Sequence, residues 1–218
     1  MKIDIITLFP SMFIGPFDTS MLKKAKDMGA VEIATHDLRE YATDKHKSVD
    51  DRPYGGGPGM VLRVDVVESA LNNLKKKNSK IILLSPQGEM FSQKKARDYA
   101  KLKHIILLAG HYEGFDERIR KHLVDEELSI GNYVLTGGEI PAMVVTDAVV
   151  RLIPGVLEEE ASSLESFSEG ETLDYPVYTR PAEHNSWEVP EVLLSGDHKK
   201  ITEWRAQKSQ EKTQSRKQ

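Results

Sequence analysis

Short apolar runs alternate along most of the chain with stretches whose apolar positions recur at helical spacing. A short apolar run bounded by turn residues predicts a strand, and an apolar face that recurs every three to four residues predicts an amphipathic helix. Strands are expected over residues 2–8, 31–36, 80–85, 104–109 and 127–135. Helices are expected over residues 11–28, 64–77, 92–102, 115–123 and 140–153.

This alternation predicts an α/β fold with a mostly parallel sheet, helices on both faces and right-handed crossovers. Residues 39–60 interrupt it with a polar, glycine-rich stretch that ends in DDRPYGGGPGM. Loops of this length are uncommon in a compact domain and are often functional. The helix expected over residues 140–153 is apolar on nearly every side, which predicts burial all round, as a subunit interface would provide.

The composition changes after this helix. Residues 158–171 carry six acids and no base among Ser, Ala and Gly, which is typical of a flexible linker. The sequence therefore predicts an α/β domain over residues 1–157, an acidic linker over 158–171 and a small second unit over 172–218. This second unit is small for an independent core, so we expect it to pack against the first domain or against a partner subunit.

The overall composition places the chain among ordinary globular proteins. Its 218 residues are 39% hydrophobic and 29% charged. No apolar run approaches the roughly 20 residues of a spanning helix, and the first residues lack the features of an export signal. Cysteine is absent, which excludes disulfides, thiolate nucleophiles and cysteine-based metal sites. A cytoplasmic location without membrane association is expected.

The net charge of −4 is unevenly distributed. Residues 198–218 carry seven bases and two acids, a net charge of +5, so residues 1–197 carry 23 bases and 32 acids, a net charge of −9. A basic segment on an acidic body can contact the phosphate backbone of a nucleic acid. A solvated, frayed C-terminus is the alternative explanation of the same charges.

Three glycine-containing segments follow predicted strands: SPQG at 85–88, AGHYEG at 109–114 and SIGNYVLTGGEIP at 129–141. In open parallel sheets, ligands bind beyond the carboxyl ends of the strands, where loops and helix N-termini converge. Glycine permits close approach of the backbone to a flat ligand. Together the segments predict a compact nucleoside pocket, although each one alone is more typical of an ordinary turn.

Several familiar kinds of site are excluded. The dinucleotide motif G-x-G-x-x-G does not follow a strand, and neither the P-loop motif nor the nucleophile motif G-x-S-x-G occurs. The seven histidines show no spacing typical of a zinc site. Acids and arginines remain as candidate chemical groups. Among them, Asp147 and Arg151 lie four residues apart on one predicted helix, where they can also simply form a salt bridge.

Seven multi-residue motifs then occur in order: HKSVDDRPYGGGPGM, LSPQG, GHYEGFDERI, SIGNYVLTGGE, RLIPGVL, DYPVYTRP and LLSGDH. Together they resemble the bacterial tRNA (guanine-N1)-methyltransferase family, from residue 2 to about residue 209. The resemblance implies methyl transfer from S-adenosyl-L-methionine to N1 of the guanine at tRNA position 37, beside the anticodon. It also implies a homodimer with an active site shared between subunits, a deep trefoil knot of the SPOUT class in the α/β domain, and a small helical tRNA-binding unit.

The resemblance assigns twelve residues to the cofactor pocket, and they fall in the three glycine-containing segments. They are Pro86, Gly110, Glu113, Ile130, Gly131, Asn132, Tyr133, Val134, Leu135, Gly137, Gly138 and Pro141. It places Arg151 at the catalytic arginine, and Asp51, Ser166 and Asp174 among residues that bind the substrate. Mg²⁺ is also implied, with no site that this sequence can assign.

The candidate general base departs from the family pattern. The family usually has an aspartate directly before Ser166, where this chain has Glu165. Without the resemblance, Glu165 is simply one of six solvated acids of the linker. Asp174 is the competing candidate for the base.

Two other functions remain open from the sequence. One is a related knotted methyltransferase that acts on another RNA position or on a ribose hydroxyl. The other is an RNA-binding module without catalysis, whose glycine loops are structural. Binding of S-adenosylmethionine separates this module from the enzymes.

Overall fold

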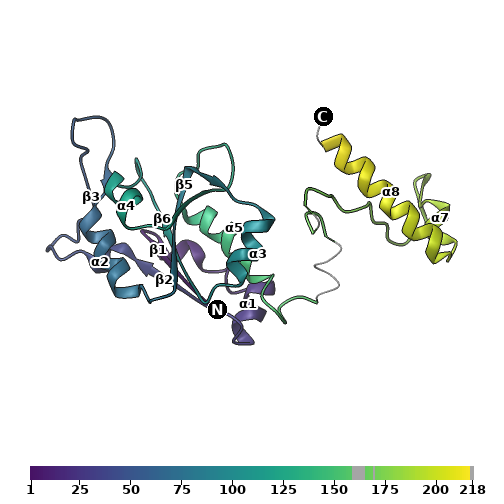
Figure 1. Ribbon diagram of the computed structural model, residues 1–218, viewed down its shortest axis with the longest axis horizontal. Helices are drawn as coiled ribbons and strands as arrows, with labels where there is room; N and C mark the ends of the chain where they lie inside the picture. The colour runs from purple at the N-terminus through teal and green to yellow at the C-terminus, as the bar shows by residue number, and fades with distance from the viewer. Residues whose placement is uncertain (159–164, 169, 217–218) are drawn as a thin grey trace. The chain divides into compact units, whose positions relative to one another are not determined.

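The computed structural model describes residues 1–158, 165–168 and 170–216. The chain divides into two compact units, Met1–Leu157 and Glu158–Gln218, and each is considered by itself below. Figure 1 shows the elements of both units along the chain. Within the described residues, no helix is both long enough and apolar enough to cross a membrane.

The first unit is built on a parallel five-stranded sheet with the strand order β2-β1-β6-β5-β7. Its strands are β1 (Lys2–Thr7), β2 (Glu32–Asp37), β5 (Ser79–Met90), β6 (His104–Ala109) and β7 (Glu126–Ser129). All six residues of β6 are buried, which explains why its sequence is an apolar run without alternation. The predicted α/β class with a mostly parallel sheet is confirmed.

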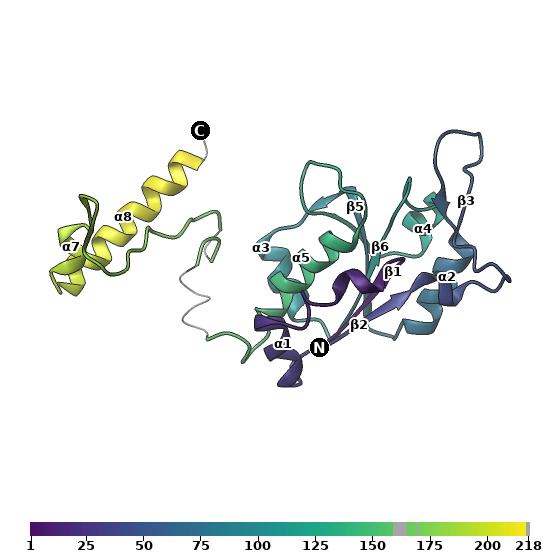
Figure 2. The same cartoon turned by 180° about the vertical axis from the view of Figure 1, so that it is seen from behind.

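Helices cover both faces of this sheet (Figures 1 and 2). One face carries α1 (Ser20–Asp27), α3 (Gln93–Ala100) and α5 (Glu139–Val150). The other face carries α2 (Val64–Leu74) and α4 (Glu117–His122). The short elements are the 3-10 turns η1 (Pro10–Phe13) and η2 (Leu38–Tyr41), and the hairpin of β3 (Asp50–Asp51) and β4 (Val61–Leu62).

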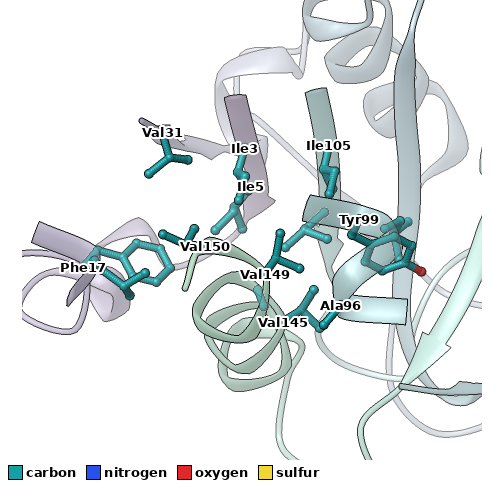
Figure 3. Packing of buried hydrophobic residues seen from close by; sticks show 14 of the residues in the cluster. Ile3, Ile5, Phe17, Val31, Ala96, Tyr99, Ile105, Val145, Val149 and Val150 are labelled. Atoms are coloured by element: carbon teal, nitrogen blue, oxygen red, sulfur yellow. The ribbon is translucent and has the colours of Figure 1, made fainter. Parts of the chain in front are cut away.

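The two helical layers create two hydrophobic clusters, because successive strand residues point to opposite faces of the sheet. Ile3 and Ile5 of β1 pack against Val145 and Val149 of α5 in one cluster (Figure 3). Ile6 lies in the other cluster, beneath α2. Helix α5 is therefore fixed along the sheet, and its N-terminus lies near the carboxyl ends of the strands.

Two predicted elements were wrong in extent. The helix expected over residues 11–28 is only η1 followed by α1, because Gly15 and Ser20 adopt φ of 93° and 51° and Pro16 cannot donate a helical hydrogen bond. The extended run expected over residues 127–135 ends as a strand at Ser129. Residues 130–138 form an irregular loop instead.

The second unit contains a hairpin of β8 (Glu183–His184) and β9 (Trp187–Glu188), the short helix α7 (Glu191–Leu194) and the long helix α8 (His198–Arg216). The basic C-terminal segment is therefore helical through Arg216 rather than frayed. The predicted linker over 158–171 lies partly outside the described residues, which omit 159–164 and 169, and the last two residues, 217–218, also lie outside them.

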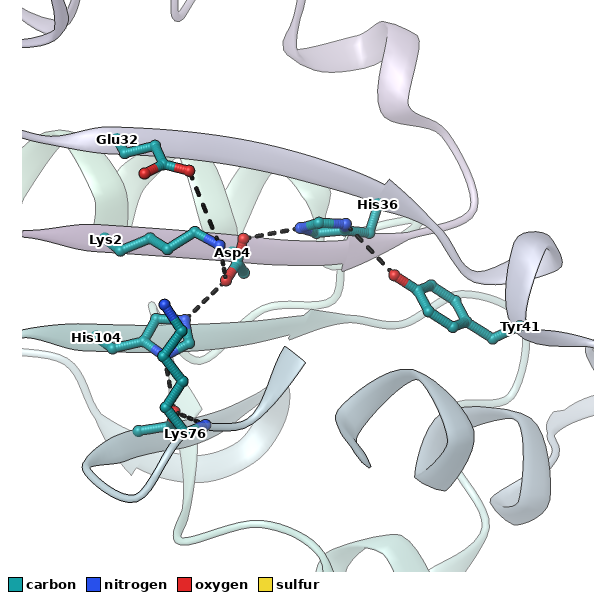
Figure 4. A network of polar contacts seen from close by, with 8 residues as sticks. Lys2, Asp4, Glu32, His36, Tyr41, Lys76 and His104 are labelled. Atoms are coloured by element: carbon teal, nitrogen blue, oxygen red, sulfur yellow. Dashed lines mark hydrogen bonds and ion pairs between the residues drawn. The ribbon is translucent and has the colours of Figure 1, made fainter. Parts of the chain in front are cut away.

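A buried polar cluster ties three strands of the first unit together (Figure 4). The Asp4 side chain is fully buried, with Oδ1 2.8 Å from Nε2 of His36 and Oδ2 2.7 Å from Nε2 of His104. The Lys2 ammonium lies 3.0 Å from the same carboxylate. Burial alone raises the pKa of Asp4, but the hydrogen bonds from His36, Lys2 and His104 outweigh burial and hold this pKa well below its usual range.

Candidate active site

One pocket of about 270 Å³ opens at the carboxyl ends of β5, β6 and β7. It is lined by the three glycine-containing segments singled out in the sequence. Eleven of the twelve residues expected to bind the cofactor line it, whereas Asn132 is exposed and is not part of the lining. The structure therefore brings almost all of the predicted pocket residues together, although they come from three separate loops.

Gly138 holds the end of the loop after β7 against the C-terminal end of β6. Its N–H donates to the carbonyl of Gly110 over 2.7 Å. A Cβ atom at Gly138 would lie 2.7 Å from Cα of Ala109 and 2.8 Å from N of Gly110, closer than side chains are found to backbone. Only glycine therefore allows the N-terminus of α5 to pack directly against the end of β6.

A break in the pairing of β5 with β7 forms another wall of the pocket. Leu84 and Glu89 of β5 both pair with Leu128 of β7, so residues 85–88 leave the ladder as a bulge. Gly88 lies so close to the backbone of Glu127 and Leu128 that no side chain would fit there. The bulge places Pro86 and the neighbouring Gln87 along the pocket.

A cationic side chain at this wall was not predicted from the sequence. Arg120 of α4 lines the pocket, hydrogen-bonds to Gln87 and lies 2.8 Å from Oε1 of Glu127. The α4 helix that carries Arg120 is capped at its N-terminus by Asp116, whose carboxylate accepts the N–H of Arg118 over 2.8 Å. A hydrogen bond from the Arg118 side chain lowers the pKa of Asp116. The GHYEGFDERI motif contains Asp116 and Arg118 but ends at Ile119, so Arg120 lies directly after it, and the motif alone does not show that Arg120 lines the pocket.

A buried acid supports the pocket from behind. The Glu139 side chain is 1% exposed and accepts the hydroxyl proton of Thr7 over 2.7 Å. Its other oxygen lies 3.8 Å from Nε2 of His111, which lines the pocket. The centre of the His111 ring lies 4.8 Å from that of Phe9, with the two ring planes tilted by 59°. The sequence signal for Glu139 was its position directly after the two glycines of TGGE.

The long glycine-rich loop is attached to the same site. The N–H of Glu113 donates to the carbonyl of Met60 over 3.0 Å, and the N–H of Leu62 donates to Gly114 over 2.9 Å. Asp51 lies on β3, within residues 39–60, and is exposed. It is not part of the pocket lining. The loop therefore borders the pocket through its last residues, and Asp51 lies outside.

Arg151, the predicted catalytic arginine, lies elsewhere in the first unit. It caps the C-terminus of α5 and, with Asp147, lines a second hollow beside α1. Gly138 caps the N-terminus of the same helix. At 1.5 Å of rise per residue, the thirteen steps between them span roughly 20 Å. Within one chain, Arg151 is therefore at the opposite end of α5 from the pocket.

The other candidate residues for chemistry gather in one loop of the second unit. The hydroxyl oxygen of Ser166 accepts the N–H of Asp174 over 2.9 Å. The carbonyl of Glu165 accepts the N–H of Ser168 over 3.0 Å. The Asp174 carboxylate accepts the N–H of Tyr175 over 2.7 Å. Both candidate bases therefore belong to a single loop closed by Ser166.

The described residues contain no group of three or more His, Asp or Glu side chains placed to hold a metal ion. The Mg²⁺ that the family resemblance implies therefore has no assigned site among them.

A glycine-lined pocket at the carboxyl ends of parallel strands is the arrangement found in α/β enzymes that bind nucleotides or nucleosides. The family model described as tRNA (Guanine-1)-methyltransferase TrmD matches residues 1–218, and the chain belongs to this family. The chain is thus an enzyme, a methyltransferase, as its seven motifs predicted.

Curated relatives support this assignment. A tRNA (guanine-N(1)-)-methyltransferase of Carboxydothermus hydrogenoformans is 54% identical over 209 residues, which cover 96% of this chain and 83% of the relative. Proteins of the same name from Bacillus cereus (strain AH820) and Bacillus anthracis (strain A0248) are each 54% identical over 220 residues, covering 99% of this chain and 90% of each relative.

Proposed function

We propose that the enzyme transfers the methyl group of S-adenosyl-L-methionine to N1 of the guanine at position 37 of tRNA. The observation that carries this proposal is the convergence of the three glycine-containing loops on one pocket, with eleven of the twelve expected residues in its lining. The names of the relatives support guanine N1 of tRNA as the acceptor. Because the proposed substrate is tRNA, we also propose a cytoplasmic location.

The side chains of the candidate site suit this chemistry. Guanine N1 carries a proton and is a poor nucleophile until a positioned carboxylate removes it, the role proposed for Glu165. Negative charge then builds on O6, where the guanidinium of Arg151 stabilises it with charge-assisted hydrogen bonds. The cofactor supplies a methyl group already activated on a sulfonium. The protein contributes binding, orientation and electrostatics.

The direct test is methyl incorporation into unmodified tRNA. A transcript with G at positions 36 and 37 is expected to be methylated, and the same transcript with A at position 37 is expected to remain unmodified. Equal incorporation into both would place the methyl group elsewhere and favour the related methyltransferase that acts on another RNA site. Failure of the protein to bind S-adenosylmethionine in a calorimetric titration would favour the non-catalytic RNA-binding module.

Gly138→Val is expected to weaken S-adenosylmethionine binding about 10- to 100-fold. The added side chain meets the backbone of Ala109 and Gly110, and such overpacking typically costs about 1–3 kcal/mol. Isothermal titration measures the affinity, with Asn132→Ala as the matched control because Asn132 is in the same loop but not in the lining. Equal affinities of both variants and the parent for S-adenosylmethionine would contradict the assignment of the cofactor to this pocket.

We further propose a homodimer in which Arg151 of one chain serves the pocket of its partner. The distance of roughly 20 Å along α5 supports this arrangement, because one chain cannot supply both parts at one point. Helix α5 is also not buried all round within one chain: Ile140 is 46% exposed and Val144 is 41% exposed. An apolar face of this kind is typical of a subunit interface.

Complementation tests the shared site. At an S-adenosylmethionine concentration well below the Kd of Gly138→Val, the Arg151→Ala and Gly138→Val homodimers are each expected to be nearly inactive. A heterodimer with one copy of each, purified through two different tags, contains one intact combination of pocket and arginine. It should recover about half of the wild-type activity per dimer. A heterodimer as inactive as its parents would show that the arginine and the pocket act within one chain.

We also propose that the first unit contains a trefoil knot of the SPOUT class and that the second unit binds tRNA. The return of the chain from β7 to Gly110 supports the knot, because it brings the loop after β7 across the end of β6. Helix α8 supports the tRNA-binding role, since most of its bases are exposed and can contact phosphates.

A further inference from the structure

The loop that carries Glu165, Ser166 and Asp174 is held by helix α8. The N–H of Leu173 donates to the hydroxyl oxygen of Thr213 over 2.9 Å, and the carbonyl of Leu173 accepts the hydroxyl proton of Ser209 over 2.5 Å. Side chains four residues apart on one face of α8 therefore satisfy both backbone polar groups of the residue before Asp174.

The directions of these hydrogen bonds are determined by the helix itself. The hydroxyl of Thr213 donates its single proton to the carbonyl of Ser209, one turn earlier, over 2.7 Å. Its oxygen is then available only as an acceptor, which is what the N–H of Leu173 requires. Ser209 donates its own proton to Leu173. All three residues are half-buried, so losing one partner leaves a polar group poorly solvated.

A second contact holds the other side of the loop. The guanidinium of Arg216, at the end of α8, lies 4.9 Å from the centre of the Phe167 ring. Phe167 adopts a φ of 66°, a left-handed conformation that a bulky residue keeps only when its surroundings hold it. Its N–H also closes the loop by donating to Thr172 over 2.7 Å.

We propose that Ser209 and Thr213 are positioning residues for the methyl transfer. They hold the loop of the candidate bases on α8, so that the carboxylate is presented in one defined place. This inference rests on the proposed function, in which a carboxylate of this loop deprotonates guanine N1. A general base must be placed to within a fraction of an ångström, and Glu165 has one more rotatable bond than the aspartate usual in its family.

The same arrangement links substrate binding to catalysis. Helix α8 also carries the exposed bases of the second unit, including Lys212 and Arg205. One rigid helix therefore both contacts a tRNA phosphate through these bases and holds the loop through Ser209 and Thr213. The acceptor base and its general base are then positioned by the same element.

Thr213→Val and Ser209→Ala test the inference. Each is expected to lower the single-turnover rate of methylation about 10- to 100-fold, the cost typical of a misplaced reactive group. The KM for tRNA and the affinity for S-adenosylmethionine should stay within about twofold, because binding groups are untouched. Thr213→Ser, which keeps the hydroxyl, should restore most of the rate. Hydrogen exchange at the amide of Leu173 should become faster in Thr213→Val.

Matched controls lie on the same helix. Thr202 makes the same hydrogen bond to the carbonyl four residues earlier, at His198, over 2.8 Å, and Ser215 donates to Lys212 over 2.9 Å. Thr202→Val and Ser215→Ala therefore change helix propensity equally but leave the contact with Leu173 intact. Their methylation rates are expected to match the parent.

Two outcomes would overturn the inference. One is an equal loss of rate in Thr213→Val and Thr202→Val, which would show a general effect on α8. The other is a normal rate in Thr213→Val while Glu165→Gln is inactive, which would leave the base assignment intact and remove only the positioning role. If Glu165→Gln and Asp174→Asn are both fully active, the assignment of a general base to this loop is wrong. This outcome is distinguishable from a failure of the positioning role, which is measured by comparing Thr213→Val with Thr202→Val.

Discussion

Replacing Glu165 with Gln is expected to lower the single-turnover rate of tRNA methylation about 10²- to 10⁴-fold, the usual cost of removing a general base. The amide keeps the shape of the side chain but cannot accept the N1 proton. S-adenosylmethionine affinity should be nearly unchanged, because the proposed cofactor pocket is formed by residues of the first unit. Rapid-quench measurement of methyl transfer, with calorimetry of cofactor binding, separates the two effects.

Asp174 is the competing candidate for the base, because its N–H donates to the hydroxyl oxygen of Ser166, the residue directly after Glu165. Glu165→Asp should retain much of the activity, since the family resemblance implies the shorter acid at this position. A normal rate in Glu165→Gln together with an inactive Asp174→Asn would assign the base to Asp174. Normal rates in both would return Glu165 to the role of a solvated linker acid.

The sheet and the pocket lining could be predicted because both depend on local sequence. An uninterrupted apolar run such as residues 105–109 becomes a central parallel strand, since both of its faces are covered by helices. The carboxyl ends of neighbouring parallel strands meet at one edge of the sheet, so glycine-containing loops after three strands converge. Gly110 and Gly138 lie in different loops and yet share a hydrogen bond for this reason.

Contacts between distant segments could not be predicted in this way. Leu173 is 36 residues from Ser209 and 40 from Thr213, and no periodicity in the chain relates them. Arg151 was one of several candidate acids and arginines, and only the family resemblance gave it a catalytic role. The length of α5 separates it from the pocket of its own chain. The helix expected over residues 11–28 failed for the opposite reason: Gly15 and Pro16 are local signals that should have outweighed the apolar spacing around them.

Asp4→Asn is expected to have the largest effect on stability, about 3 kcal/mol in the free energy of unfolding. Removing one partner of a buried ion pair typically costs about 3–5 kcal/mol, and the lower end applies because the Lys2 side chain, 25% exposed, can turn toward solvent. The amide cannot accept hydrogen bonds from His36, His104 and Lys2 together, so polar groups on three adjacent strands lose their common acceptor.

The pH dependence of this effect has a definite sign. The pKa of Asp4 is lower in the folded protein than its ordinary value of 3.8, so the folded state binds this proton less readily than the unfolded chain. The stabilisation is therefore fully present above the unfolded pKa and is lost as the pH falls toward the folded pKa. Urea unfolding should show a large difference between the parent and Asp4→Asn at neutral pH, and a smaller one near about pH 3.

Asp27→Asn is the matched control, because Asp27 pairs with Lys23 over 2.7 Å on the exposed surface of α1. Exposed pairs of this kind contribute little, so the control should unfold almost as the parent does at both pH values. A difference between Asp4→Asn and the parent that stayed constant down to about pH 3 would show that packing, rather than the charge of the carboxylate, stabilises this cluster. Equal stabilities of Asp4→Asn and Asp27→Asn at neutral pH would show that the histidines find other partners when the carboxylate is absent.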